Sequence, residues 1–463
     1  MSPVNSNGPS QSSQSNHQQS SFKKGTLLRV LGVGFGLAVT IGGTIGMGIL
    51  RTPGEVATQL PTPTLYLGVW ILGGLYALLG TVSVAELGAM IPRSGGWYVF
   101  VHRAMGNYPG FIVGWSDWLS TCGTLAVIAM VVGEYSAVLI PRLAGRDKSI
   151  ALVVVLLFAA LQWRGIRWGS FTQNLTSLLK TLIFVVIAIA AFVFAGKSVA
   201  GTTLAAPQGF ALVGALIIAL QGVLYTYDGW YGVIYFGEEV RNPKRDVVRS
   251  MFGGVLLVIA IYFVVNLAYV YVLPMSRLAG ENFAAGAVAK EIFGVYGDKT
   301  IRVLAILSLL STINAYTLTS PRILYAMSCD ELFARRAARV NKGGTPTVAL
   351  LISTVVALLF IFRSFEQVLA ALAFFFVANY AMAYISVIVL RWREPELPRP
   401  YRAWGYPWTT GIVLLGSIAF LIGAVISDRV NHKRDSLFAL AFLAASVPVY
   451  LVVHLMSSRR RAA

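Results

Sequence analysis

Residues 42–48 read Gly42-Gly43-Thr44-Ile45-Gly46-Met47-Gly48, inside an apolar stretch long enough to cross a lipid bilayer. A second such stretch contains Tyr225-Thr226-Tyr227-Asp228-Gly229-Trp230-Tyr231-Gly232. In hydrocarbon, an unwound backbone lacks partners for its N–H and C=O groups, so it is tolerated only where it lines a cavity or binds a ligand. Two interrupted helices in corresponding positions of two halves indicate a transporter's binding site. Tight helix packing by small residues is the alternative for one such cluster, but two matching clusters favour a site.

The composition is typical of a membrane protein. Of 463 residues, 56% are hydrophobic and 12% are charged, whereas a soluble domain carries about 25% charged residues. The two cysteines, Cys122 and Cys329, give no disulfide or metal framework. The four histidines lack the spacing of metal ligands, and no Gly-Lys-Ser/Thr follows the glycine runs as in a phosphate loop. We therefore expect no enzyme, no metal site and no cofactor.

Apolar windows of roughly 20 residues, the length that spans a bilayer as a helix, recur along the chain. There are twelve, of which the fourth and ninth are short: 27–52, 64–91, 109–139, 149–163, 172–196, 209–236, 248–273, 300–328, 346–363, 366–390, 409–427 and 437–456. The two interrupted windows are the first and the sixth. This odd offset gives corresponding helices opposite orientations, as an inverted five-plus-five repeat requires. We predict an all-α membrane protein with twelve transmembrane helices, of which helices 1 and 6 are discontinuous.

The basic residues predict the orientation of these helices. The net charge is +18, and if both termini share a side, the loops of that side hold the larger share of Lys and Arg, which places them in the cytoplasm. The charge therefore reflects topology in the cell (inner) membrane, with the bilayer and not nucleic acid as the partner. The expected divisions are a disordered tail over 1–22, a repeat core over 23–391, a cytoplasmic loop with helices 11 and 12 over 392–456, and a basic tail over 457–463.

The two interruptions predict the two ends of a ligand site. Unwinding the first helix frees N–H groups at the start of its second half, and these suit a carboxylate together with the helix dipole. Met47 and Gly48 are the candidate donors, and Gly46 permits close approach of the ligand. Freed carbonyl groups would face an ammonium; the candidates are those of Thr44, Tyr225, Thr226 and Asp228. A site with both polarities fits a zwitterion.

Three motifs resemble the amino acid–polyamine–organocation superfamily. Its first helix is similar to Gly43-Thr44-Ile45-Gly46-Met47-Gly48-Ile49-Leu50-Arg51-Thr52-Pro53. Its sixth helix and exit loop are similar to Tyr225-Thr226-Tyr227-Asp228-Gly229-Trp230 and Glu238-Glu239-Val240-Arg241-Asn242-Pro243-Lys244-Arg245. The loop after its tenth helix is similar to Arg391-Trp392-Arg393-Glu394-Pro395-Glu396-Leu397-Pro398-Arg399-Pro400-Tyr401-Arg402. The likeness is greatest to bacterial relatives of the L-type amino acid transporters, and it implies a LeuT-like fold and transport of amino acids.

The resemblance also assigns roles to single residues. Tyr225 stands where an aromatic residue, usually Phe, gates the site from the outside, and Tyr231 replaces an Asn that is common among L-type relatives. Lys180 lies deep in the fifth window, where an ionisable group is costly and marks a functional site. In sodium-independent members such a lysine occupies the place of a bound sodium ion and ties span five to the first break near Gly42. Snorkelling of its ammonium to the interface is the alternative.

Three acidic residues, Glu86, Asp117 and Glu134, fall inside the second and third windows, where we expect structural pairing more than proton relay. On span eight, Ser311 and Asn314 either face the site or join helices through hydrogen bonds. We predict a secondary active amino acid transporter that is sodium-independent and works by alternating access, through exchange or proton symport. Small neutral and cationic substrates both remain open. A channel is the alternative, but two local breaks without a continuous polar stripe favour a carrier; no partner subunit is predicted.

Overall fold

The computed structural model describes residues 26–194, 205–363, 365–430 and 435–462. These ranges fold almost entirely into helices, and their only β pairings are isolated bridges. The tail predicted over 1–22 lies outside the described residues, and the C-terminal helix continues to Ala462, within the segment predicted as a basic tail. The all-α prediction is therefore confirmed.

The first predicted window is a broken span. Helix α1 (Val33–Thr44) and helix α2 (Gly48–Gln59) are bent by 44° across Ile45, Gly46 and Met47. The sixth window is also interrupted, because α8 (Phe210–Tyr227) ends at a turn that leads into the single 3₁₀ turn η2 (Gly232–Tyr235). No α-helix follows until α9 (Pro243–Val272). We call residues 45–47 the first break and residues 228–231 the second break.

The two breaks cross with backbone against backbone. Gly229 has a φ of +102°, and a Cβ atom there would lie 2.8 Å from the carbonyl carbon of Gly43. A Cβ on Gly48 would lie 2.6 Å from Oγ1 of Thr226. Both positions therefore need glycine, Gly229 also because side chains rarely adopt its positive φ. The glycine runs in the sequence mark this crossing.

Longer helices surround the breaks. They are α3 (Pro63–Met90), α4 (Trp97–Met105), α5 (Asn107–Leu139), α6 (Asp147–Trp163), α7 (Ile166–Phe194), α12 (Val295–Cys329), α13 (Thr347–Ile361), α14 (Phe365–Arg393), α15 (Trp408–Val430) and α16 (Asp435–Ala462). Short connecting helices are η1 (Pro141–Leu143), α10 (Met275–Leu278), α11 (Ala284–Phe293) and η3 (Arg335–Ala338). In the described ranges, eight helices are long and apolar enough to span a membrane, or nine with α1 and α2 as one span. The short windows 149–163 and 346–363 correspond to α6 and α13, and window 437–456 to the apolar part of α16.

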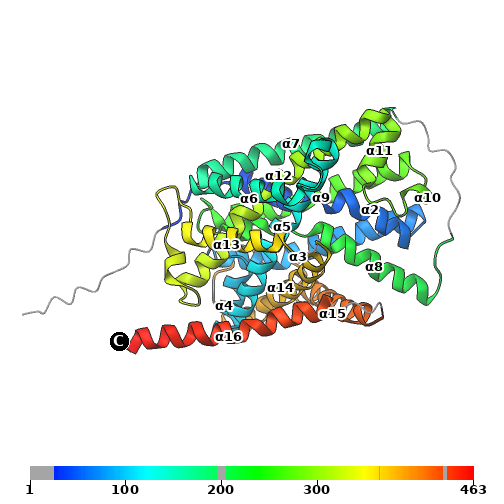
Figure 1. Cartoon of the computed structure of the whole chain (residues 1–463). Helices are drawn as coiled ribbons and strands as arrows, with labels where there is room; N and C mark the ends of the chain where they lie inside the picture. The colour runs from blue at the N-terminus through cyan, green and yellow to red at the C-terminus, as the bar shows by residue number, and fades with distance from the viewer. Residues whose placement is uncertain (1–25, 195–204, 364, 431–434, 463) are drawn as a thin grey trace, which may run out of the picture.

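Burial separates inner from outer helices. The apolar windows of α5 and α12 are 72% and 67% buried, and the two helices pack against each other. That of α15 is only 17% buried, and Figure 1 shows α16 along one edge of the bundle. Helix α1 packs on α7, α9 and α12, whereas α8 packs on α2 and α3. The breaks therefore lie inside the bundle, enclosed by its most buried helices.

Candidate functional site

A small cavity lies between the two breaks. All seven residues that the sequence assigned to a ligand line it: Thr44, Gly46, Met47, Gly48, Tyr225, Thr226 and Asp228. Its volume is about 30 Å³, which has room for about two water molecules. The structure therefore brings the predicted residues together around a small space, and any larger ligand requires the site to widen.

The wall formed by the first break presents backbone donors. Within the described residues, the N–H groups of Gly46, Met47 and Gly48 donate to no backbone or side-chain acceptor. The reason is geometric, because the first N–H groups of a helix have no intrahelical partner, and α2 begins at Gly48. The N–H groups of Leu50 and Arg51 already close on the Met47 carbonyl, at 3.1 and 3.2 Å. The donors that the sequence assigned to a carboxylate are thus available.

Three of the four carbonyl groups expected to face an ammonium already accept one hydrogen bond each, and each keeps a second lone pair. On α9, the Tyr262 hydroxyl lies 2.8 Å from the Thr44 carbonyl oxygen and 3.0 Å from that of Thr226. The Tyr225 carbonyl accepts the Asp228 N–H at 3.2 Å. A phenol has one proton, which the two carbonyl oxygens share. The sequence argument considered each break alone and gave no weight to a donor from a neighbouring helix.

The Asp228 side chain provides the negative charge of the site. Its Oδ1 accepts hydrogen bonds from Tyr231, at 2.9 Å, and from Tyr380 on α14, and its Oδ2 accepts one from Tyr316 on α12 at 3.3 Å. Asp228 is 6% exposed and is the only acidic residue among those that line the cavity. An ionised carboxylate offers about four acceptor positions. Three phenols and the backbone N–H of Gly229 therefore surround this carboxylate.

Lys180 lies behind the first break. Its Nζ donates to the Gly42 carbonyl at 3.0 Å, to the Ile45 carbonyl, and to Thr312 Oγ1 at 2.8 Å. The side chain is 1% exposed, so it does not snorkel to the interface. Among the described residues no carboxylate pairs with it. The ammonium uses its three N–H groups on the break and on α12, which is the contact expected near Gly42.

Other helices complete the cavity with residues that the sequence did not single out. These are Thr124 and Ile128 on α5, Thr312 and Tyr316 on α12, and Phe376 on α14. The pairs on α5 and α12 are each four residues apart and so share a helix face. The α12 candidates Ser311 and Asn314 join helices instead: Asn314 Nδ2 donates to Gln173 Oε1 at 2.8 Å, and Ser311 lies 3.1 Å from Ser177.

The intramembrane carboxylates have structural partners, as expected. Glu86 accepts from Arg391 at 2.6 Å and from Arg399 at 3.2 Å. Glu134 pairs with Arg51 at 2.7 Å. Asp117 Oδ1 accepts from the Tyr235 hydroxyl at 2.9 Å. These contacts tie separate segments of the bundle together and leave Asp228 as the carboxylate at the cavity.

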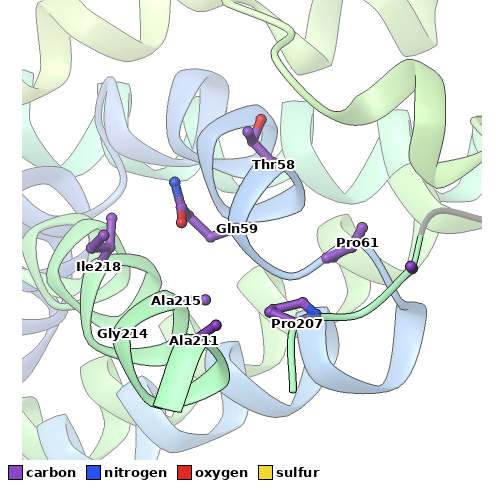
Figure 2. A pocket seen from close by; sticks show the side chains of 9 residues that line it. Thr58, Gln59, Pro61, Pro207, Ala211, Gly214, Ala215 and Ile218 are labelled. Carbon is purple, nitrogen blue, oxygen red and sulfur yellow. The ribbon is translucent and has the colours of Figure 1, made fainter. Parts of the chain in front are cut away.

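A wider pocket of about 470 Å³ opens between the far end of α2 and α8 (Figure 2). Gln59 of α2 extends toward Ile218 of α8, and Pro61 lies near Pro207 at the other side of the pocket. It contains no titratable side chain and none of the predicted residues. A ligand site combines apolar walls with convergent polar groups, and of these two cavities that combination favours the smaller one.

Comparison with known proteins identifies the family of the chain. The amino acid permease family matches residues 36–453. The chain is 30% identical over 431 residues to the serine/threonine exchanger SteT of Bacillus subtilis (strain 168), covering 92% of this chain and 96% of that protein. It is 26% identical to b(0,+)-type amino acid transporter 1 of Homo sapiens, with 93% and 89% covered. Asc-type amino acid transporter 1 of Mus musculus is 29% identical, with 81% and 73% covered.

Proposed function

Since the chain belongs to the amino acid permease family, we propose that it exchanges small neutral amino acids across the cell membrane without sodium. Amino acid transport by a multi-pass membrane permease follows from the family and from relatives that are transporters and exchangers. The same relatives exclude an enzyme and do not favour a channel. The substrate, the exchange and the residue roles are the proposal.

The small cavity between the breaks carries the proposal. The unused N–H groups of Gly46, Met47 and Gly48 would bind the carboxylate of an amino acid, as helix N-termini bind anions. The α-ammonium would pair with the Asp228 carboxylate by displacing one of its hydrogen-bond donors. A basic side chain would need a second carboxylate, and Asp228 is the only acidic residue among those that line this cavity. The arrangement therefore favours neutral amino acids over cationic ones.

Alternating access follows from the cavity volume. The cavity of about 30 Å³ has room for about two water molecules. An amino acid is larger than this, so binding requires the bundle to open on one side at a time. We propose the twelve-helix, LeuT-like arrangement of five plus five inverted helices for this motion, with Tyr225 as the gate. The excess of Lys and Arg in one set of loops places both termini in the cytoplasm of the cell.

Lys180 would replace a bound sodium ion. Its ammonium holds the Gly42 and Ile45 carbonyl oxygens and the Thr312 hydroxyl, which are oxygen ligands of the kind a sodium ion would need. Transport would then need no sodium. Exchange is favoured over proton symport because the relative SteT is named an exchanger and aligns over nearly the whole chain.

The test is uptake of labelled serine by the purified protein in proteoliposomes. We expect saturable uptake that rises with unlabelled serine inside the vesicles and does not change when choline replaces sodium. An applied pH gradient should add little. Sodium-dependent uptake, uptake indifferent to internal amino acid, or unsaturable flux with channel currents would each contradict the proposal.

A further inference from the structure

Thr124 on α5 has an unpaired hydroxyl at the cavity. Among the described residues, its Oγ1 is the only fully buried side-chain N or O atom that both lines this cavity and lacks a hydrogen-bond partner. The residue is 4% exposed. The other hydroxyls nearby on the same helix are satisfied, since Ser120 and Thr121 donate to the Asp117 carbonyl at 2.9 and 2.7 Å. Thr124 therefore departs from its neighbours.

A buried hydroxyl without a partner is unfavourable, and native proteins almost always satisfy such groups. A helical threonine ordinarily donates to the carbonyl group one turn earlier. Thr124 does not make that bond and adjoins the space where the ligand would bind. The missing partner is thus best supplied by the ligand itself.

We propose that Thr124 recognises the side chain of the substrate, and that this side chain carries a hydroxyl, as in serine or threonine. The inference rests on the proposed amino acid exchange. A hydroxyl both donates and accepts, so it complements another hydroxyl better than a methyl or a charged group. Met47, Ile128 and Phe376 supply the apolar part of the cavity wall, and they restrict the side chain to a small size.

The experiment compares substrates that differ by one hydroxyl. Alanine competes with serine, and 2-aminobutyrate with threonine, for labelled serine exchange in proteoliposomes. In the unmodified protein we expect each hydroxylated amino acid to be preferred by about tenfold, because a site built to bond a hydroxyl leaves its own group unpaired with the analogue. Equal competition within either pair would overturn the proposal without any variant.

Variants then locate the preference. Thr124→Val replaces the hydroxyl with a methyl of similar size, and we expect the serine-to-alanine preference, measured as a ratio within this variant, to fall to about unity. Thr124→Ser should retain the preference. Thr121→Val is the matched control, because that hydroxyl bonds the Asp117 carbonyl in its own helix.

The remaining outcomes also support or contradict the role of Thr124. A Thr124→Val protein that exchanges alanine and still prefers serine tenfold disproves the role of Thr124. If Thr124→Val is inactive towards alanine, loss of the preference in Thr124→Ser would likewise count against a hydroxyl contact. Failure of the unmodified protein to exchange any amino acid would instead refute the proposed function, so the two failures are distinct.

Discussion

The two breaks handle charge in opposite ways. At the first break a buried cation, Lys180, satisfies the carbonyl groups of Gly42 and Ile45 and leaves the N–H groups free for a ligand. At the second break a buried anion, Asp228, is surrounded by the phenols of Tyr231, Tyr316 and Tyr380. The comparison teaches that unwinding a helix in a membrane requires partners from other helices, and that their charge decides which end of a zwitterion each break can receive.

The largest effect should come from removing the cation. Lys180→Ala leaves the buried Gly42 carbonyl without its lysine donor. The Ile45 carbonyl keeps only the Thr312 hydroxyl, at 3.3 Å. An unpaired buried group costs about 1–3 kcal/mol, and the first break then loses the shape that presents its N–H groups. We expect labelled serine exchange to fall by at least about 100-fold. The exposed Lys290 on α11 offers the control Lys290→Ala, which should retain activity. Undiminished exchange by Lys180→Ala would show that the first break does not need a buried cation.

Removing the anion should have the next largest effect. Asp228→Asn keeps the size of the side chain but deletes the charge that would bind the α-ammonium, and hydrogen bonds to charged groups are worth about 1.5–3 kcal/mol. We expect the KM for serine exchange to rise by roughly 10- to 100-fold with a smaller change in kcat. Glu134→Gln, at the partly exposed pair with Arg51, is the comparison variant. An unchanged KM would show that the ammonium binds elsewhere.

The contact that joins the two breaks should matter less. Tyr262→Phe removes the hydroxyl shared by the Thr44 and Thr226 carbonyl oxygens, at a cost of about 0.5–1.5 kcal/mol for one hydrogen bond. We expect a drop of several degrees in the thermal midpoint of the detergent-solubilised protein and roughly 10-fold slower exchange. Tyr269→Phe loses only a 3.4 Å contact to the Ile49 carbonyl and should change both less. A larger effect of Tyr269→Phe than of Tyr262→Phe would disprove the role of the Tyr262 hydroxyl in joining the two breaks.

The smallest effect should be a change of specificity. Tyr231→Phe removes one donor from Asp228 Oδ1 and frees an acceptor position for a second cationic group. We expect lysine, a poor inhibitor of the unmodified protein, to inhibit serine exchange a few-fold better. Tyr227→Phe is matched, because that hydroxyl donates to the Trp70 carbonyl and Tyr227 does not line the cavity. Equal lysine inhibition in both variants would mean that the tyrosines do not set charge preference.

The sequence predicted the breaks and Lys180 because each violates a rule of membrane helices. Gly43 and Gly229 are small where two backbones meet, and Lys180 is charged where lipid would surround it. Tyr262, Tyr316 and Thr124 violate no rule, since tyrosine and threonine are ordinary in an apolar helix. Their importance arises from contacts between helices that no pattern along one helix encodes. Apolarity also cannot tell a buried helix from a buried 3₁₀ turn, so the 3₁₀ turn η2 in place of a second half-helix after the break needed the structure.

The crossing of Gly43 and Gly229 has a mechanical consequence. No side chain separates the two backbones there. Movement of one broken segment is therefore not absorbed by side chains before it reaches the other. The two broken segments contact each other at the place where the ligand would bind. In the proposed alternating access, a ligand that displaces one broken segment would therefore displace the other by direct contact.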